Sequence, residues 1–432
     1  MKRFALILSL SAWSAATFGQ TTNVPAFLTL ANAEKIALQY HPQIKQANYL
    51  LEAAQEVVKE TRSGYFPTVN LYADAVGATS EGARITAGGL NNPSVYDRGA
   101  GGGQVNQLIT DFGRTANLTA SSKYRAQAEG QNVNTTREQV LLQVDGSYFD
   151  ALEAQAVLRV AQQTFDTRKT LLDQITALAT NKLRSQLDVS FAQVQLQQAN
   201  LLVEQASNNA DAAMATLSTA LGYSDYHEFM LADEAPPTNN FSTDVSGMVQ
   251  TALSRRPELL SLRDDREAAT RYARAQRDSR LPTVEAVGVA GAAPFRDDRD
   301  LRSDYFAGGI QVSVPIFAGG LYVSKQRQAE YQAQADNELL RSVENNVIRD
   351  VHIAWLDLND AVQQLETTEQ LAANAAEAFT LAQARYTSGI SSIVELSDAQ
   401  LNLTQAQIAE ANARYNVLIQ QANLNYQMGT IQ

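Results

Sequence analysis

The chain has 432 residues, no cysteine and a formal net charge of −12 at pH 7. Without cysteine it can form no disulfide bond, and it cannot carry a lipid on an N-terminal cysteine. Nucleic-acid phosphates require a basic partner, so the acidic balance argues against nucleic acid as a ligand.

The first residues have the order of a secretory signal peptide. Lys2 and Arg3 precede an apolar run at residues 4–12, and small residues follow. We expect cleavage after Ala16 or Gly19, which makes residues 1–19 a signal peptide outside the fold. Beyond it, no stretch of about 18 apolar residues predicts a membrane-spanning helix.

The rest of the chain is an internal repeat. Residues 37–44 (ALQYHPQI) match residues 252–259 (ALSRRPEL) at an offset of 215, which is 252 minus 37. Residues 182–196 match residues 389–403 at an offset of 207, which is 389 minus 182. The sequence therefore divides into repeat one at 28–221, a linker at 222–243 that contains Pro236-Pro237, and repeat two at 244–430.

Each repeat has the same predicted order of elements. A helix of about 35 residues, ending near Ser63 or Ser279, comes first, followed by a strand, a loop and a second strand. A very long helix, a tight turn and a last long helix complete the repeat. We expect the loops at 78–102 and 292–304, with the glycine run at 99–103 in the first loop or at a strand end. No Gly-Lys-Ser/Thr follows that run, so it does not match a phosphate-binding loop.

The predicted strands alternate in polarity, although this pattern also fits a sheet on a soluble core. In residues 69–75, Val69 and Leu71 point one way while Asn70 and Tyr72 point the other. Four strands of about ten residues can cross a membrane when tilted, but the smallest membrane barrels have eight strands. Several chains must therefore pool their strands if these lie in a membrane. Three chains would supply twelve strands and twelve long helices, but the sequence alone leaves two, three or four chains open.

The long helices have the pattern of a coiled coil. Residues 321–388 contain neither glycine nor proline, and residues 114–181 contain only Gly130 and Gly146. In the last helix of repeat one, apolar residues recur every seven positions, and an alanine stands three residues after each. The recurring residues are Val189, Leu196, Val203, Ala210 and Leu217. This heptad pattern predicts a left-handed supercoil.

With this order established, the chain resembles the TolC family of outer-membrane efflux channels. The resemblance rests on LTLANAEKIALQYHP (28–42), on FPTV and LPTV before the strands, on TDFGR and IFAGG after them, and on YTSGISSIVELSDAQ (386–400) at the second tip. It covers nearly all of residues 28–428. It implies a mainly α fold with a small β part: a trimeric twelve-stranded outer-membrane β-barrel, with four strands per chain, continued by a long periplasmic α-helical coiled-coil barrel.

The resemblance also implies a function. The chain would be the outer-membrane exit duct of a tripartite efflux system, passing small molecules passively from an inner-membrane pump and a periplasmic adaptor protein to the exterior. Such a duct would be a homotrimer embedded in outer-membrane lipid. The same duct serving type I protein secretion is an alternative. A pore-less periplasmic coiled-coil scaffold is a third reading, which the alternating strands disfavour.

Enzymatic motifs are missing from the sequence. Its three histidines, His41, His227 and His352, are scattered and match no zinc-binding pattern. No Gly-x-Ser-x-Gly elbow is present. We therefore expect neither an enzyme nor a bound cofactor or metal.

The two hairpin turns contain acidic residues that have two explanations. Ser185 with Asp188, and Ser392 with Glu395, fit the Ser-x-x-Asp/Glu capping box, which alone accounts for both acids. The family resemblance instead implies that Glu395 and Asp398 ring the closed periplasmic mouth, where they would attract cations. It also implies that Asp188 and Tyr386 help to hold this mouth shut. Asp398 lies beyond the capping box and is the stronger candidate for selectivity.

The resemblance further implies that the tips of both hairpins dock to the adaptor. The residues concerned are Leu183, Arg184 and Ser185 in repeat one, and Gly389, Ile390 and Ser391 in repeat two. Ser391 stands where the family has an arginine, which Lys182 or Arg184 could replace. We expect Gly389 to end its helix in the left-handed conformation, and Asn181 to do so in repeat one, where Lys182 occupies the glycine position.

Overall fold

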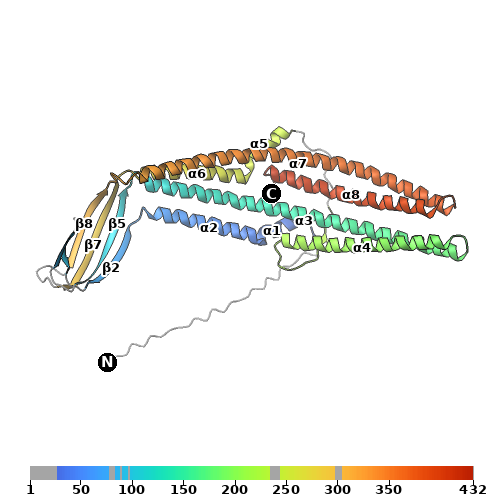
Figure 1. The fold of residues 1–432 in the computed structure, drawn as a ribbon, viewed down its shortest axis with the longest axis horizontal. Helices are drawn as coiled ribbons and strands as arrows, with labels where there is room; N and C mark the ends of the chain where they lie inside the picture. Colours follow the sequence, from blue (N-terminus) through green and yellow to red (C-terminus); the bar gives the residue numbers. More distant parts are fainter. Residues whose placement is uncertain are drawn as a thin grey trace, which may run out of the picture.

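The computed structural model describes residues 27–76, 83–87, 90–95, 98–233, 244–296 and 304–431. The predicted signal peptide and the Pro236-Pro237 part of the linker lie outside these residues. The described chain is long and narrow, with a β-sheet at one end and the turns of two helical hairpins at the other (Figure 1). The elements between them therefore separate the sheet from the tips by the full length of the molecule.

Each repeat begins with two helices where the sequence predicted one. Repeat one has α1 (Leu30–Tyr40) and α2 (Pro42–Ser63), and repeat two has α5 (Val245–Arg255) and α6 (Pro257–Asp278). The breaks fall at His41 and Arg256, because a residue before proline is sterically excluded from the helical region. The ψ angles of 128° and 122° at these two residues show this. The single 35-residue helix was therefore a wrong prediction.

Four strands form one antiparallel sheet in the order β2-β5-β7-β8. They are β2 (Thr68–Val76), β5 (Arg98–Thr110), β7 (Thr283–Arg296) and β8 (Asp304–Ser313). A separate hairpin joins β3 (Ala83–Ala87) to β4 (Leu90–Val95). The glycine run at 99–103 lies at the N-terminal end of β5, where β2 and β7 pair with it, so the strand-end expectation is confirmed. The single loop expected at 78–102 was wrong, because β3, β4 and the start of β5 lie within it.

Two hairpins of long helices extend away from the sheet. The first consists of α3 (Arg114–Thr180) and α4 (Gln186–Ala220), and the second of α7 (Leu321–Thr387) and α8 (Ile393–Gln427). At about 1.5 Å per residue, a helix of 67 residues is about 100 Å long. Val189, Ala199 and Leu217 are buried, which confirms the predicted heptad seam. None of the described helices combines the length and hydropathy needed to cross a membrane.

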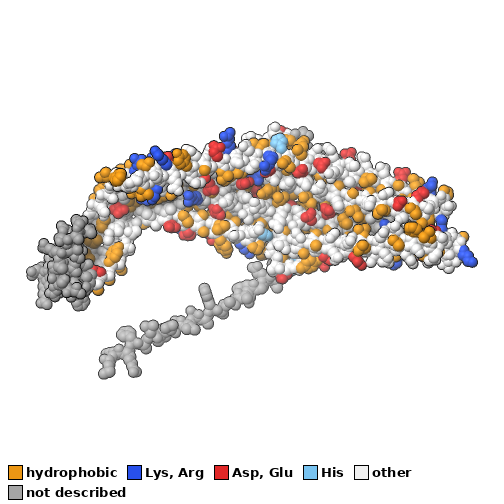
Figure 2. All heavy atoms as spheres, viewed as in Figure 1, with side chains coloured by type: hydrophobic (Ala, Val, Ile, Leu, Met, Phe, Trp, Pro, Cys, Tyr) orange, Lys and Arg blue, Asp and Glu red, His pale blue; other side chains and the backbone are white. Residues whose placement is uncertain are grey.

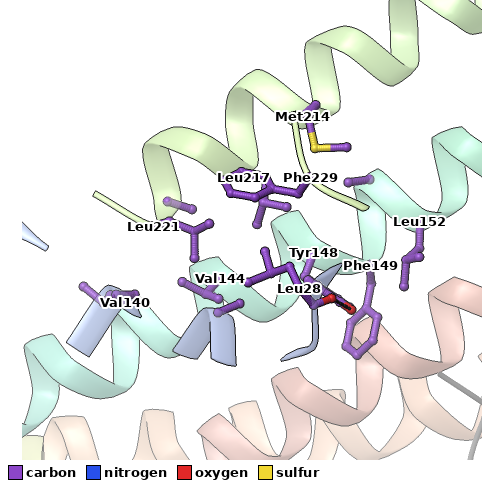
Figure 3. Packing of buried hydrophobic residues seen from close by; sticks show 14 of the residues in the cluster. Leu28, Val140, Val144, Tyr148, Phe149, Leu152, Met214, Leu217, Leu221 and Phe229 are labelled. Atoms are coloured by element: carbon purple, nitrogen blue, oxygen red, sulfur yellow. Dashed lines mark hydrogen bonds between the residues drawn. The ribbon is translucent and has the colours of Figure 1, made fainter. Parts of the chain in front are cut away.

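A hydrophobic cluster at mid-length ties the ends of repeat one to the long helices (Figure 3). A short parallel pair, β1 (Phe27–Leu28) and β6 (Met230–Leu231), lies against it. The buried Tyr148 hydroxyl lies 2.9 Å from the carbonyl oxygen of Leu28 and 2.7 Å from that of Ala232. This tyrosine therefore joins both strands to α3.

Side by side, the helices form an open layer with two edges. In the half near the tips α3 packs against α4 and α8, and α8 packs against α7. In the half near the sheet α3 packs against α2 and α6, and α6 packs against α7. Within the described residues, α7 thus lies at one edge of the layer and also contacts α5 near its middle, while α2 and α4 form the opposite edge.

Candidate functional site

The strand register assigns the side chains of the sheet to two different faces. Val69 pairs with Val105, Val105 with Gly288, and Gly288 with Gly308, so these four residues lie in one row on one face. Alternation along each strand extends this assignment to the other residues. The large exposed apolar side chains of this apolar face are Val69, Leu71, Val105, Phe306, Ile310 and Val312.

The opposite, polar face has a different composition. It contains Asn70, Tyr72, Asp74, Gln104, Asn106, Glu285, Tyr305 and Gln311. On this face the side-chain amide of Gln104 donates to the Asn106 oxygen at 2.9 Å. One apolar and one polar face is the pattern of a membrane barrel, in which apolar side chains face lipid and polar ones face an aqueous interior.

At the far end of the molecule, the first hairpin turn closes on a left-handed lysine. Lys182 has φ +58°, whereas Asn181 has φ −85°, so the prediction for Asn181 was wrong. The Leu183 N–H donates to the Leu178 carbonyl at 2.9 Å, and the Lys182 N–H donates to that of Ala179 at 2.9 Å. These two bonds require the residue just after the C-cap to be left-handed, whatever its type.

The second turn has the same geometry, with a glycine at the left-handed position. Gly389 has φ +75°, as predicted. Its N–H donates to the Tyr386 carbonyl at 3.0 Å, and the Ile390 N–H donates to that of Arg385 at 3.0 Å. The two turns are therefore equivalent, and repeat one bears a conformational cost at Lys182 that repeat two avoids.

The serine caps at the two tips differ in one hydrogen bond. In repeat one the Asp188 N–H donates to Ser185 Oγ at 3.2 Å and the Ser185 N–H donates to Asp188 Oδ2 at 3.4 Å, which completes the predicted capping box. In repeat two the Glu395 N–H donates to Ser392 Oγ at 3.3 Å. The Glu395 carboxylate does not return to the cap but accepts from Arg385 Nε at 3.0 Å.

Arg184 links the first turn to the second hairpin. Its Nη2 donates to the Tyr386 carbonyl at 2.6 Å, and its guanidinium lies 4.3 Å from the centroid of the Tyr386 ring. Burial raises the pKa of Tyr386, Arg184 opposes this effect, and the nearby Asp188 carboxylate adds to it. The Tyr386 hydroxyl has no hydrogen-bond partner among the described residues, so Asp188 and Tyr386 are close without a direct bond.

Hydrophobic side chains join the two hairpins beside this link. Ile175, Val189 and Ala192 of the first hairpin pack with Ala382, Tyr386, Ile393 and Leu396 of the second. Leu183 and Ile390 are 69% and 70% exposed at the extreme tip, whereas Ser391 is partly buried. Glu395 and Asp398 are exposed, and no described residue forms an ion pair with Asp398. The structure thus clusters Asp188 with Tyr386, pairs Glu395 with Arg385, and leaves Asp398 facing solvent.

Two features of the tip were not predicted from the sequence. The Arg385–Glu395 ion pair joins residues ten positions apart across a turn, and no spacing rule identifies such a pair. The stacking of Arg184 on Tyr386 joins residues of different hairpins. The sequence contained one signal for these contacts. Positions 182 and 389 match between the repeats, which indicates that the two turns lie at the same end of the molecule.

The chain belongs to the family described as "Outer membrane efflux protein", whose sequence profile matches residues 35–223 and 248–430. Among curated relatives, the outer membrane protein TolC of Escherichia coli (strain K12) is 27% identical over 433 residues, covering 95% of this chain and 85% of the relative. The solvent efflux pump outer membrane protein SrpC of Pseudomonas putida is 26% identical, covering 89% and 80%. The alkaline protease secretion protein AprF of Pseudomonas aeruginosa is 22% identical, covering 94% and 85%.

Solved structures confirm the fold. The chain is similar to CusC with a TM-score of 0.79 at 16% identity, covering 93% of this chain and 92% of that one. It is similar to the outer-membrane channel OprN with a TM-score of 0.79 at 19% identity, covering 93% and 90%. The chain is therefore an outer-membrane exit duct of the type used in efflux or in type I secretion, and its long helices form the periplasmic part.

Proposed function

We propose that the chain functions as a homotrimer in which three sheets close into one twelve-stranded barrel. The observation that carries this proposal is the sheet itself, which has an apolar face and two outer strands, β2 and β8, that each lack a partner on one side among the described strands. An open edge cannot face lipid, because its N–H and C=O groups would be unsatisfied. Strand direction alternates along β2-β5-β7-β8, so β8 of one copy can pair antiparallel with β2 of the next.

The edges of the helical layer support the same arrangement. Apolar side chains are exposed along α7 on one edge and along α2 and α4 on the other, and Figure 2 shows hydrophobic side chains spread along the visible helical surface. Three copies placed edge to edge would bury these side chains and enclose a tunnel. The side chains are Tyr49, Leu50 and Val57 on α2, Phe191, Val194 and Leu201 on α4, and Tyr331, Leu339, Leu356, Leu371 and Leu381 on α7.

The hairpin tips would form the periplasmic mouth of this tunnel. We propose that Asp398 and Glu395 ring the opening, with Asp188 and Tyr386 at the contact between hairpins that sets its width. Glu395 is already paired with Arg385, which leaves Asp398 as the main contributor of negative charge. The exposed tip residues Leu183 and Ile390 are the apolar points at which a periplasmic adaptor would dock.

Efflux of small molecules is the function that the relatives support best. The family description and the solvent pump relative name efflux, whereas AprF, with lower identity, is named for protein secretion. An inner-membrane pump and an adaptor would deliver the cargo, and the duct itself would pass it without energy input.

Deletion and reconstitution test the proposal. A strain lacking this chain should become sensitive to small toxic compounds and regain resistance with the wild-type chain. Purified protein in planar bilayers should give discrete channels that trivalent cations block, and Asp398→Ala should weaken this block more than Glu395→Ala does. If the strain lacking this chain keeps normal resistance but no longer secretes a protein, type I protein secretion is the better function. A monomer found in the periplasmic fraction would contradict the channel.

A further inference from the structure

One row across the polar face of the sheet contains two tyrosines with two glycines between them. Tyr72 on β2 pairs with Gly102 on β5, Gly102 pairs with Gly291 on β7, and Gly291 pairs with Tyr305 on β8. All four residues therefore lie on the same face. Neither tyrosine is part of the helical mouth, and the lipid-facing role of the sheet involves only the opposite face.

The Tyr305 side chain lies along the sheet surface and covers both glycines. A Cβ atom at residue 291 would lie 2.5 Å from the Tyr305 hydroxyl oxygen and 2.6 Å from Cζ. A Cβ atom at residue 102 would lie 2.7 Å from the same oxygen. The ring thus occupies space that only glycine leaves open. Aromatic side chains over glycine also stabilise sheets, but here Tyr305 remains 50% exposed and Tyr72 58% exposed.

Other glycines of the sheet do not have this role. Gly309 lies on the same polar face, in the row of Thr68, and a Cβ atom there would meet nothing within 4 Å. Gly288, on the apolar face, also has open space. Of these four glycines, Gly102 and Gly291 are the two that lie under the Tyr305 ring.

One described carboxylate lies close to the rings along the polar face. Asp74 follows Tyr72 by two residues, whereas Glu285 lies six positions before Gly291 along β7. The faces of aromatic rings attract flat organic cations through stacking and cation–π contact.

We propose that Tyr72 and Tyr305 form an aromatic site on the wall of the barrel that binds organic cations with flat aromatic ring systems. This inference rests on the trimeric duct proposed above. Threefold symmetry would place three copies of Tyr72 at one level of the lumen and three copies of Tyr305 at another, because barrel strands are tilted. Cargo of this class would contact the rings on its way out.

Single-channel currents of the full-length protein in planar bilayers test the site. Ethidium is the flat aromatic probe, and tetraethylammonium is the matched cation without an aromatic ring. The wild type is compared with Tyr72→Leu/Tyr305→Leu, which removes the rings, and with Tyr72→Phe/Tyr305→Phe, which keeps them. Gly309→Ala is the control for an added methyl group on the same face. The two single leucine variants are measured in parallel, so that a double variant that fails to assemble does not stop the comparison.

For each ring removed, the leucine variants should require about two- to fivefold more ethidium for half-block, with unchanged potassium chloride conductance, since one exposed cation–π contact has about this value. The phenylalanine and Gly309→Ala variants should resemble the wild type. Equal ethidium block in wild type and leucine variants, or equal block of the wild type by ethidium and tetraethylammonium, would overturn the aromatic site alone. Wild-type protein that forms no channels would instead contradict the duct.

Discussion

Replacing Arg184 with alanine should loosen the contact between the two hairpin tips. The variant loses a charged hydrogen bond of 2.6 Å to the Tyr386 carbonyl and the stacking at 4.3 Å on the Tyr386 ring. A hydrogen bond to a charged group contributes about 1.5–3 kcal/mol, and an exposed cation–π contact about 0.5–1 kcal/mol. Because Arg184 is only partly buried, we expect a local loss of about 1.5 kcal/mol, or about tenfold in an opening equilibrium.

Amide hydrogen exchange read by mass spectrometry measures this opening directly. Peptides covering residues 181–185 and 386–390 should exchange about tenfold faster in Arg184→Ala, with no change at mid-length. Arg385→Ala is the matched control, since it removes an exposed ion pair with Glu395, and such pairs contribute less than about 1 kcal/mol. Equal exchange at the tips in Arg184→Ala and wild type would refute the proposed link.

Three further changes test other parts of the structure. Tyr148→Phe removes the hydroxyl that lies within hydrogen-bond distance of the Leu28 and Ala232 carbonyls, while the Leu28 carbonyl still accepts from the Ala232 N–H at 2.9 Å. The folded protein should therefore lose about 0.5–1.5 kcal/mol and melt at a lower temperature. Lys182→Gly relieves a left-handed residue at φ +58° and should stabilise the first turn by about 0.5–1 kcal/mol, seen as slower proteolysis there. Burial raises the pKa of the Glu138 carboxyl from 4.5 to about 7 in the folded chain. The unfolded chain therefore gives up this proton at a lower pH than the folded chain, and the free energy of unfolding falls as pH rises through that range. Glu138→Gln should therefore raise the melting temperature at pH 8 but not at pH 4.

Local sequence patterns predicted the local structure well. The seven-residue spacing placed Val189 and Leu217 in the seam of the first hairpin, and both are buried. The capping box at Ser185 and Asp188 formed as expected, because all its atoms lie within four residues. Rules of this kind depend on short distances along the chain, so they need no knowledge of the tertiary structure.

The errors arose where distant segments decide the conformation. The expected loop at 78–102 extends into the glycine run because of its composition, yet pairing with β2 and β7 begins the strand at Arg98. Glu395 has the sequence of a capping residue, but Arg385 across the turn takes its carboxylate. Lys182 adopts the left-handed conformation because two hydrogen bonds that close the turn require it. Each outcome depends on partners that the local sequence does not specify.

The central claim, that three copies close one barrel through β2 and β8, is tested most directly by cross-linking. The chain has no cysteine, so introduced cysteines are the only thiols. Asn70→Cys on β2 is combined in turn with Ala307→Cys, Gly309→Cys or Gln311→Cys on β8, which sample three registers of the same polar face. After oxidation of outer membranes, at least one pair should give a covalent trimer as its largest species on denaturing gels. Monomers alone with all three pairs, or a series that ends at a dimer or a tetramer, would contradict the proposed barrel.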